Sequence, residues 1–254
     1  MEEKVILEVS HVAKTFFSNK QDTDAIEDIS IDVRKNEFLV LLGPGQCGKT
    51  TFLNILAGLV KPTSGTIRLD GKDISGTDQR IAMVFQKTGL YEWKTAMENA
   101  ELGLKYRGAS KADRRRIAQK YLDLVGLHGF ENAYPHALSG GMKQRVGIAR
   151  AYTAGPEILL MDEPFGALDA QTRYVMEEEI LRIWETEKRT ILFVTNNIEE
   201  AVTLGDRVIQ FTERPAKVKK VYDLRELARP RDHVSADFLR IRQEIAANEE
   251  LTLE

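Results

Sequence analysis

The stretch "GPGQCGKTT" at residues 43–51 constrains the fold of this chain more than any other feature. It fits the pattern G-x-x-x-x-G-K-[ST], in which successive backbone N–H groups and a helix N-terminus together bind phosphate. The apolar run "EFLVLLG" before it predicts a buried strand, and "TTFLNILAGL" after it has helical periodicity. Because this is the strand, loop and helix order that the pattern requires, we expect a phosphate-binding loop here.

Two side chains of this loop can contact a bound nucleotide and its metal ion. Lys49 can reach the β- and γ-phosphates of a nucleotide as a point charge, and the Thr50 hydroxyl is a suitable hard ligand for Mg²⁺. Cys47 is the only cysteine, so it forms no internal disulfide, and we interpret it as a loop residue without redox or nucleophilic function. The other residues expected to line the phosphate site are Gly43, Pro44, Gly45, Gln46, Gly48 and Thr51.

Strand-like and helix-like segments alternate along most of the chain. "VILEVS" and "ISIDV" predict antiparallel strands, whereas "IAMVFQ", "EILLMDE", "TILFVTN" and "RVIQFT" predict buried strands separated by helices. Ser110 is the expected N-cap of a charged helix, and Ser235 that of a terminal helix. We therefore expect one α/β domain over residues 1–254, with a mostly parallel core and an antiparallel β subdomain at 1–90 and 155–254, and a helical insertion at 91–154.

Composition excludes several other classes of protein. The 254 residues carry a formal net charge of −3, so the chain lacks the basic excess that nucleic-acid binding needs. Its longest apolar runs are far below the roughly 18 residues of a membrane-spanning helix. The opening "MEEKVILEVS" lacks the pattern of a signal peptide, so we expect a cytosolic protein. We interpret the basic run at residues 111–116 as a solvated helix face.

The segment "ILLMDEP" ends an apolar strand with two carboxylates. Asp162 is expected to hold Mg²⁺ through water, and Glu163 to polarise an attacking water molecule. An ordinary polar turn after a strand would use the same residue types. The phosphate loop upstream favours the functional interpretation.

A second candidate phosphate-binding turn occurs in "LSGGMKQR" at residues 138–145. Ser139, Gly140 and Gly141 lead into a helical pattern, and such a turn at a helix N-terminus can bind an anion. One chain rarely uses two of these turns on one phosphate. We therefore expect this turn to contact the nucleotide of a partner subunit.

Five segments in order, "GPGQCGKTT", "MVFQ", "LSGGMKQRV", "ILLMDEP" and "GALDA", resemble the Walker A, Q-loop, signature, Walker B and D-loop motifs of the ATP-binding subunits of ABC transporters. The resemblance covers nearly the whole chain. "PHALSGGMKQRVGIARA" and "ARPRDHVSADFLRIRQEI" are similar to the ATPases of nitrate, sulfonate and taurine importers. The resemblance implies a P-loop NTPase of ABC type that hydrolyses ATP with Mg²⁺ at the cytoplasmic face of the membrane to drive solute uptake.

The resemblance also implies roles for single residues. Phe16, or its neighbour Phe17, matches the aromatic side chain that stacks on adenine. Gln86 matches the glutamine that contacts Mg²⁺ and water, and Asp169 matches a residue that bridges two subunits. The implied assembly is a head-to-tail dimer with two ATP molecules between its subunits. Each subunit would dock a coupling helix of a permease in a groove beside the helical insertion, and a periplasmic or extracellular solute-binding protein would supply the solute.

Two positions depart from the family pattern. Gly45 and Gln46 stand where Ser-Gly is the commoner pair, and a residue other than glycine at 46 restricts the backbone, although we expect the loop to survive. After the strand "ILFVT", Asn196 and Asn197 replace the usual His-Asp. The family's histidine reaches the γ-phosphate, whereas Asn196 is shorter and cannot become cationic.

Losing one donor to a transition state typically costs about 3 kcal/mol, or on the order of 10²- to 10³-fold in rate. We therefore expect the chain to bind ATP and close as a dimer, but to hydrolyse ATP slowly by itself. The alternative is that Asn196, Glu163 and water suffice for an ordinary rate.

Three functions remain open from the sequence. The first is the energy-coupling ATPase of an importer. The second is a catalytically weak regulatory or structural subunit paired with an intact ATPase, so a homodimer and a heterodimer both remain open. The third, a soluble ABC ATPase acting on nucleic acid, is disfavoured because there is one nucleotide domain, no long coiled-coil insertion and no basic bias. The sequence does not identify the transported solute.

Overall fold

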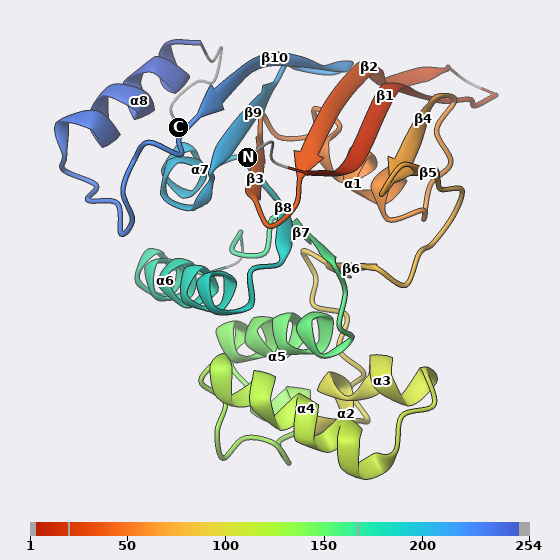
Figure 1. Cartoon of the computed structure of the whole chain (residues 1–254), viewed down its shortest axis with the longest axis vertical. Coiled ribbons are helices and arrows are strands. Elements are labelled where there is room, and N and C mark those ends of the chain that lie inside the picture. Colours follow the sequence, from red (N-terminus) through yellow and green to blue (C-terminus); the bar gives the residue numbers. More distant parts are fainter. Residues whose placement is uncertain (1–3, 20, 167, 249–254) are drawn as a thin grey trace. The chain divides into compact units, whose positions relative to one another are not determined.

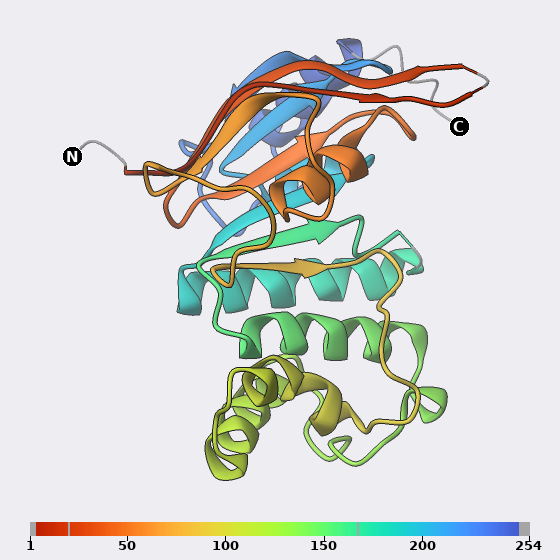
Figure 2. The same cartoon turned by 90° about the vertical axis from the view of Figure 1, so that its right-hand side faces the viewer.

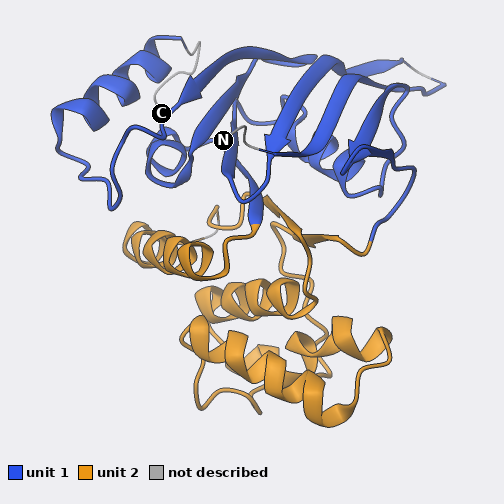
Figure 3. Cartoon of the chain, in the orientation of Figure 1, with its two compact units in different colours: residues 1–78, 190–254 blue, residues 79–189 orange. Residues whose placement is uncertain are grey.

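The chain divides into two compact units in the computed structural model, which describes residues 4–19, 21–166 and 168–248. Unit 1 comprises residues 1–78 and 190–254, and unit 2 comprises residues 79–189 (Figure 1, Figure 3). The phosphate loop and the two asparagines belong to unit 1. The acidic strand end and the Ser-Gly-Gly turn belong to unit 2.

Unit 1 is built on a mixed sheet with the strand order β5-β4-β1-β2-β10-β9-β3-β8. β1 pairs antiparallel with β2 and β4, and β1 and β2 run side by side as a long ribbon (Figure 2). β3 pairs parallel with β8 and β9, so the predicted parallel core and antiparallel β subdomain are confirmed. The strands are β1 Val5–Phe16, β2 Thr23–Arg34, β3 Phe38–Leu42, β4 Ser64–Leu69, β5 Lys72–Asp73, β8 Thr190–Thr195, β9 Arg207–Phe211 and β10 Ala216–Asp223.

The two strands that carry the candidate site of unit 1 are neighbours in its sheet. Every residue of β3 and of β8 is buried, which explains why both are continuous apolar runs rather than alternating ones. Leu42 at the end of β3 pairs with Thr195 at the end of β8. Because the carboxyl ends of parallel strands meet at one edge of a sheet, the phosphate loop and Asn196 begin at adjacent positions.

Three helices complete the described part of unit 1: α1 Lys49–Leu56, α7 Ile198–Leu204 and α8 Ala236–Ala247. The predicted terminal helix is confirmed as α8, and the Ser235 hydroxyl accepts a hydrogen bond from the Phe238 N–H at 3.3 Å. α8 packs on α7 and buries Phe238 and Ile245. The last residues of the predicted helix, 249 and 250, lie outside the described residues.

Unit 2 joins a two-stranded parallel sheet to a group of helices (Figure 2). α5 packs against α2, α3 and α4. The predicted helix after Ser110 is confirmed as α4, with the Ser110 hydroxyl accepting from the Asp113 N–H. The elements are β6 Ile81–Val84, β7 Ile158–Asp162, α2 Ala96–Ala100, α3 Leu102–Tyr106, α4 Lys111–Leu124, the short 3₁₀ helix η1 Pro135–Ala137, α5 Gly140–Thr153 and α6 Ala170–Glu187.

The basic run at residues 111–116 is solvated only in part. The Arg114 side chain is 17% exposed, and its Nε lies 3.0 Å from Oε2 of the buried Glu101. The expectation of a wholly solvated face is therefore wrong for Arg114, because a buried carboxylate needs a cationic partner. Among the described helices, none is both long enough and apolar enough to cross a membrane.

Candidate functional site

The phosphate loop of unit 1 connects β3 to α1. Lys49 is the first residue of α1, and its side chain folds back so that Nζ donates to the carbonyl oxygens of Gly43 and Pro44, both at 2.7 Å. These hydrogen bonds hold the Lys49 ammonium group at the start of the loop. Thr50, the predicted Mg²⁺ ligand, is exposed in the first turn of the same helix, and Cys47 is buried beneath the loop.

The N-terminus of α1 is suited to an anion. In this fully described helix no acidic residue occupies the first turn, and the N-cap Gly48 offers no side-chain hydrogen bond. The first N–H groups of a helix have no intrahelical acceptor, and the helix dipole gives this end a partial positive charge. With the Lys49 ammonium added, the loop can bind a phosphate group.

Two loop residues have left-handed backbone conformations. Gly48 has φ +123°, and a Cβ there would lie 2.6 Å from the Ala25 carbonyl oxygen, so only glycine fits. Gln46 has φ +62°, a conformation that costs a residue with a side chain about 1–2 kcal/mol. At Gly45, by contrast, a Cβ would meet nothing within 4 Å. The unusual Gly-Gln pair therefore places a glycine where a Cβ would fit and a strained backbone conformation at Gln46.

Phe16, the expected adenine-stacking residue, ends β1 and is 43% exposed, and Phe17 is 72% exposed. Phe16 pairs with Thr23, two residues before Ala25, whose carbonyl oxygen lies against Gly48. The Lys14 ammonium lies 4.9 Å from the centre of the Phe16 ring. Phe16 is therefore a partly exposed aromatic side chain, with the Lys14 ammonium over its ring, on the strand pair that contacts the phosphate loop.

Asn196 and Asn197 have different surroundings. Asn197 is the N-cap of α7, and its Oδ1 accepts from the N–H groups of Glu199 at 2.8 Å and Glu200 at 3.2 Å. Thr195 Oγ1 accepts from the Asn197 N–H and donates to the buried Glu200. Asn196 is exposed, and its side chain makes no hydrogen bond with the described residues. Asn197 is thus committed to the fold, while the Asn196 amide remains available to a ligand.

In unit 2, Gln86 and Glu163 meet at one edge of the two-stranded sheet. Val84 at the end of β6 pairs with Met161 of β7, so both side chains follow neighbouring strand ends. Gln86 Nε2 donates to Glu163 Oε2 at 3.3 Å. Glu163 has φ +40°, an uncommon conformation for a residue with a side chain, and such strain is often found at functional sites.

Asp162 precedes this pair at the end of β7 and is only 4% exposed. It lines a cavity of about 580 Å³ together with Gln86. The sequence did not predict the other residues of this cavity. The only signal for two of them was an aromatic side chain among polar residues, at Tyr91 in "GLYEW" and at Tyr106. Its remaining lining residues are Ala82, Met83, Phe85, Lys87, Gly89, Tyr91, Leu102, Gly103, Tyr106, Arg150, Ala151 and Ala154.

Arg150 is a further residue that the sequence did not reveal. Its guanidinium donates to the carbonyl oxygens of Thr88 at 2.6 Å and Gly89 at 2.9 Å. Burial lowers the pKa of Arg150 from its ordinary value. Arg150 therefore holds the segment that follows Gln86 against α5.

The Ser-Gly-Gly turn forms the N-terminus of α5. The Ser139 hydroxyl accepts from the Met142 N–H at 3.3 Å, and the fully described first turn of the helix has no acidic residue. A Cβ at Gly141 would lie 3.2 Å from Thr172 Cγ2, which favours glycine at this position. Ser139 and Gly141 line a cavity of about 260 Å³, and Gly140 is exposed beside them.

Asp169 is the N-cap of α6. Its carboxylate accepts from the N–H and the hydroxyl of Thr172, at 2.9 Å and 2.7 Å. These hydrogen bonds hold the pKa of Asp169 below its usual value, so its carboxylate is ionised at neutral pH. The sequence predicted Asp169 for a subunit contact, and the structure adds a capping role.

The predicted site residues are divided between the two units. Unit 1 brings the phosphate loop and Asn196 to one sheet edge, with Phe16 on the adjoining strand pair. Unit 2 brings Gln86, Asp162 and Glu163 together, and presents Ser139 and Asp169 at the starts of two helices. A phosphate loop between a parallel strand and a helix, on an α/β fold, defines the class of P-loop nucleotide-binding proteins.

Comparison with known proteins gives the family. Residues 26–166 match the ABC transporter family. An uncharacterized ABC transporter ATP-binding protein of Methanocaldococcus jannaschii is 48% identical over 95% of this chain and 90% of its own length. The taurine import ATP-binding protein of Rhizobium johnstonii is 41% identical over 95% of both chains. The nitrate import ATP-binding protein of Synechocystis is 43% identical over 84% of this chain and 80% of its own.

Solved structures agree with this result. A bacterial ABC transporter cassette in dimeric form has a TM-score of 0.78 and 34% identity, over 87% of this chain and 100% of the cassette. The same cassette bound to ADP and phosphate after hydrolysis has a TM-score of 0.77. The chain therefore belongs to the ATP-binding subunits of ABC transporters and is an ATPase of this family, as the sequence predicted.

Proposed function

We propose that the chain binds MgATP and couples its hydrolysis to solute import. The observation that carries this proposal is the N-terminus of α1, which lacks acidic residues and a side-chain cap and has the Lys49 ammonium folded over the adjoining loop. This arrangement provides positive charge and N–H donors for a polyphosphate.

The residue types also suit Mg²⁺, the ion that accompanies ATP. Thr50 offers an exposed hydroxyl and Asp162 a carboxylate, both hard oxygen ligands, and the Gln86 side chain carries an amide oxygen. In our proposal these three residues contact the ion directly or through water. When bound, the ion would neutralise charge on the β- and γ-phosphates. Phe16 would stack on adenine, and the remaining residues of the loop would contact the phosphates.

Glu163 is our candidate for orienting the attacking water. Its hydrogen bond with Gln86 links the proposed catalytic carboxylate to the segment that Arg150 holds. A partner that moved residues 86–89 would therefore shift Glu163 as well. This link supports a role for Gln86 as a sensor of the membrane partner.

The working form is proposed to be a head-to-tail dimer. Ser139, Gly140 and Gly141 provide a second helix N-terminus suited to phosphate, which one chain does not need for its own nucleotide. In the dimer, this turn would contact ATP held by the phosphate loop of the partner, and Asp169 would lie at the contact. The dimeric form of the related cassette supports this assembly.

The cavity beside Gln86 is the proposed docking site for a permease. It is lined by the exposed aromatic residues Phe85, Tyr91 and Tyr106, the last of which is 80% exposed. A short coupling helix from a permease could bury this apolar surface. The subunit would then be peripheral, at the cytoplasmic face of the membrane, with a solute-binding protein on the other side. The relatives named for taurine and nitrate import suggest a small solute that carries an oxyanion group.

Asn196 favours a low intrinsic turnover. A histidine at this position would extend further toward the γ-phosphate than the asparagine amide, and it could carry positive charge. This substitution also supports the second candidate function, a catalytically weak subunit that pairs with an intact ATPase. The two candidates share the nucleotide site and differ in the turnover of the purified chain.

The test is to measure equilibrium binding of MgATP to the purified chain by calorimetry. We expect saturable binding, weakened by about tenfold or more in Lys49→Ala, because the ammonium group is the one fixed cation of the loop. Lys61→Ala is the matched control, since Lys61 is an exposed lysine outside the loop, and it should bind as the unmodified chain does. Equal binding by Lys49→Ala, or no binding by the unmodified chain, would contradict the proposal.

A further inference from the structure

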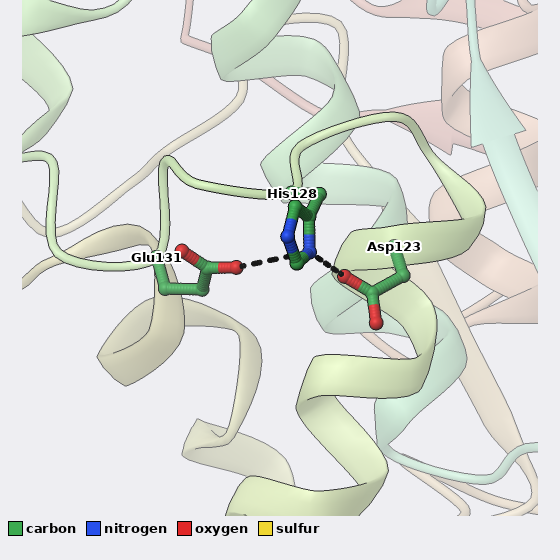
Figure 4. Close-up of side chains that lie close together, drawn as sticks. All are labelled: Asp123, His128 and Glu131. Carbon is green, nitrogen blue, oxygen red and sulfur yellow. Dashed lines mark hydrogen bonds and ion pairs between the residues drawn. The ribbon is translucent and has the colours of Figure 1, made fainter.

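Three side chains of types that can bind a metal ion converge where α4 ends (Figure 4). Asp123 lies in the last turn of α4, and His128 and Glu131 lie in the loop that follows. His128 Nδ1 is 3.1 Å from Asp123 Oδ1 and 3.9 Å from Glu131 Oε1, and the three ligand atoms lie within 4.8 Å of one another. One nitrogen and two oxygen donors therefore face a common point.

Gln119 adds a fourth polar group at the same point. It lies one turn before Asp123 on α4, and its Nε2 is 2.8 Å from both Asp123 Oδ1 and Glu131 Oε1. These are the same two oxygen atoms that face His128 Nδ1. Because turning the amide exchanges its nitrogen and oxygen, Gln119 can present an oxygen to a cation placed between the carboxylates.

The loop that carries two of these ligands is held by backbone hydrogen bonds. The carbonyl oxygens of Glu131 and Ala133 accept from the N–H groups of Met97 and Ala96 at the start of α2, both at 2.9 Å. The Gly129 N–H donates to Glu131 Oε1 at 3.0 Å. The ligands are thus fixed by two different parts of unit 2, so a shared ion would link α4 to the start of α2.

The distances suit tetrahedral coordination. Metal–ligand bonds of about 2.0–2.1 Å at tetrahedral angles separate neighbouring ligand atoms by roughly 3.4 Å. The separations from the His128 nitrogen, 3.1 Å and 3.9 Å, lie on either side of that value, and the two carboxylate oxygens lie within 4.8 Å of each other. A ligand set with imidazole nitrogen favours zinc and similar transition metals over Mg²⁺ and Ca²⁺, which prefer oxygen alone.

The charge of the cluster also suits a cation. Two carboxylates face one imidazole, so a divalent ion would neutralise the cluster without any further group.

We propose that Asp123, His128 and Glu131 form a binding site for a divalent transition metal ion such as Zn²⁺, with the Gln119 amide oxygen as a fourth ligand. The ion would cross-link α4 to the loop at the start of α2 and stabilise unit 2. The proposal does not depend on the nucleotide site.

The test is to titrate the nucleotide-free, full-length chain with Zn²⁺. Calorimetry measures the binding, and thermal unfolding measures the change in melting temperature. We expect one saturable site and a rise in melting temperature with Zn²⁺. His128→Ala should weaken the affinity for Zn²⁺ by about tenfold or more and remove the rise. Glu131→Gln, which keeps the side-chain shape, should act in the same direction, and both variants should keep the circular dichroism spectrum of the unmodified chain without metal.

The chain provides a matched control in His11. His11 Nδ1 lies 3.1 Å from Asp28 Oδ2 on an exposed surface, and the described residues place no third ligand beside that pair. His11→Ala should therefore leave Zn²⁺ binding unchanged. The proposal is wrong if the unmodified chain shows no saturable site, if His128→Ala and Glu131→Gln bind Zn²⁺ as tightly as the unmodified chain, or if His11→Ala loses as much affinity as His128→Ala.

Discussion

Asn196 and Asn197 follow the same strand, yet only Asn197 is bound into the fold. Its amide oxygen caps α7 as the carboxylate of an aspartate would, because both side chains present an oxygen to the first N–H groups of a helix. The replacement of Asp by Asn at 197 is therefore structurally conservative. The replacement of His by Asn at 196 is not, since the imidazole has no counterpart there.

This assignment predicts different outcomes for two substitutions of Asn197. Asn197→Ala should lower the free energy of unfolding by about 1 kcal/mol, because two N–H groups lose their acceptor. Asn197→Asp should stay within about 0.5 kcal/mol of the unmodified chain, since the cap is preserved and the nearby Glu199 and Glu200 carboxylates offset the gain from the helix dipole. Urea denaturation measures both values. A loss as large in Asn197→Asp as in Asn197→Ala would show that the cap is not the cause.

Some single residues were predictable from the sequence and others were not. The phosphate loop and the caps Ser110 and Ser235 could be predicted because each depends on a local pattern of a few residues. The strain at Gln46 and the bond between Gln86 and Glu163 could not. Residues 86 and 163 are far apart in sequence and meet only because β6 pairs with β7.

At the scale of elements, α4 and α6 are tied together at one point of unit 2. Glu187, near the end of α6, accepts from Lys120 Nζ at 2.6 Å and from the Tyr121 hydroxyl at 3.0 Å. Burial raises the pKa of Glu187, but these hydrogen bonds and the charges of Lys120 and Arg189 outweigh it, and the pKa is lowered from 4.5. Glu187 is therefore an ionised link between two helices.

The lowered pKa has a consequence for acid stability. A carboxyl group whose pKa is lower in the folded state stabilises the fold above its ordinary pKa, and the contribution is lost as pH falls through the folded value. Glu187→Gln should therefore lower the melting temperature near pH 7 and reduce its fall between about pH 5 and pH 3. Glu185→Gln, an exposed position on the same helix, is the control and should keep the pH dependence of the unmodified chain. Equal pH dependence in both variants would contradict the proposed link.

The elements themselves were largely predictable. Continuous apolar runs identified β3, β7 and β8 because each strand is buried along its length. The division of the chain was harder to foresee. The helices expected at 91–154 lie in unit 2 together with β6, β7 and α6. Neither composition nor periodicity along the sequence indicates that these elements belong to one unit. Their grouping depends on packing between residues far apart in sequence, and local periodicity carries no information about such packing.

For the whole molecule, we propose that nucleotide binding is intact and that the chemical step is slow. The phosphate loop, the acidic strand end and the Ser-Gly-Gly turn all have the local structure that binding needs. Asn196 stands exposed at the end of β8, beside the start of the phosphate loop, where the family uses histidine. Family membership follows from many motifs together, whereas the proposed slow rate rests on this one side chain.

The most direct measurement is the ATP turnover of the purified chain beside that of Asn196→His, under saturating MgATP, with Glu163→Gln as the inactive reference. We expect turnover well below about 1 per second for the unmodified chain, because Asn196 supplies no cationic donor. We expect a gain on the order of 10²-fold or more in Asn196→His, because one transition-state donor is restored. Ordinary turnover in the unmodified chain, with no gain from Asn196→His, would contradict the proposal that Asn196 slows hydrolysis.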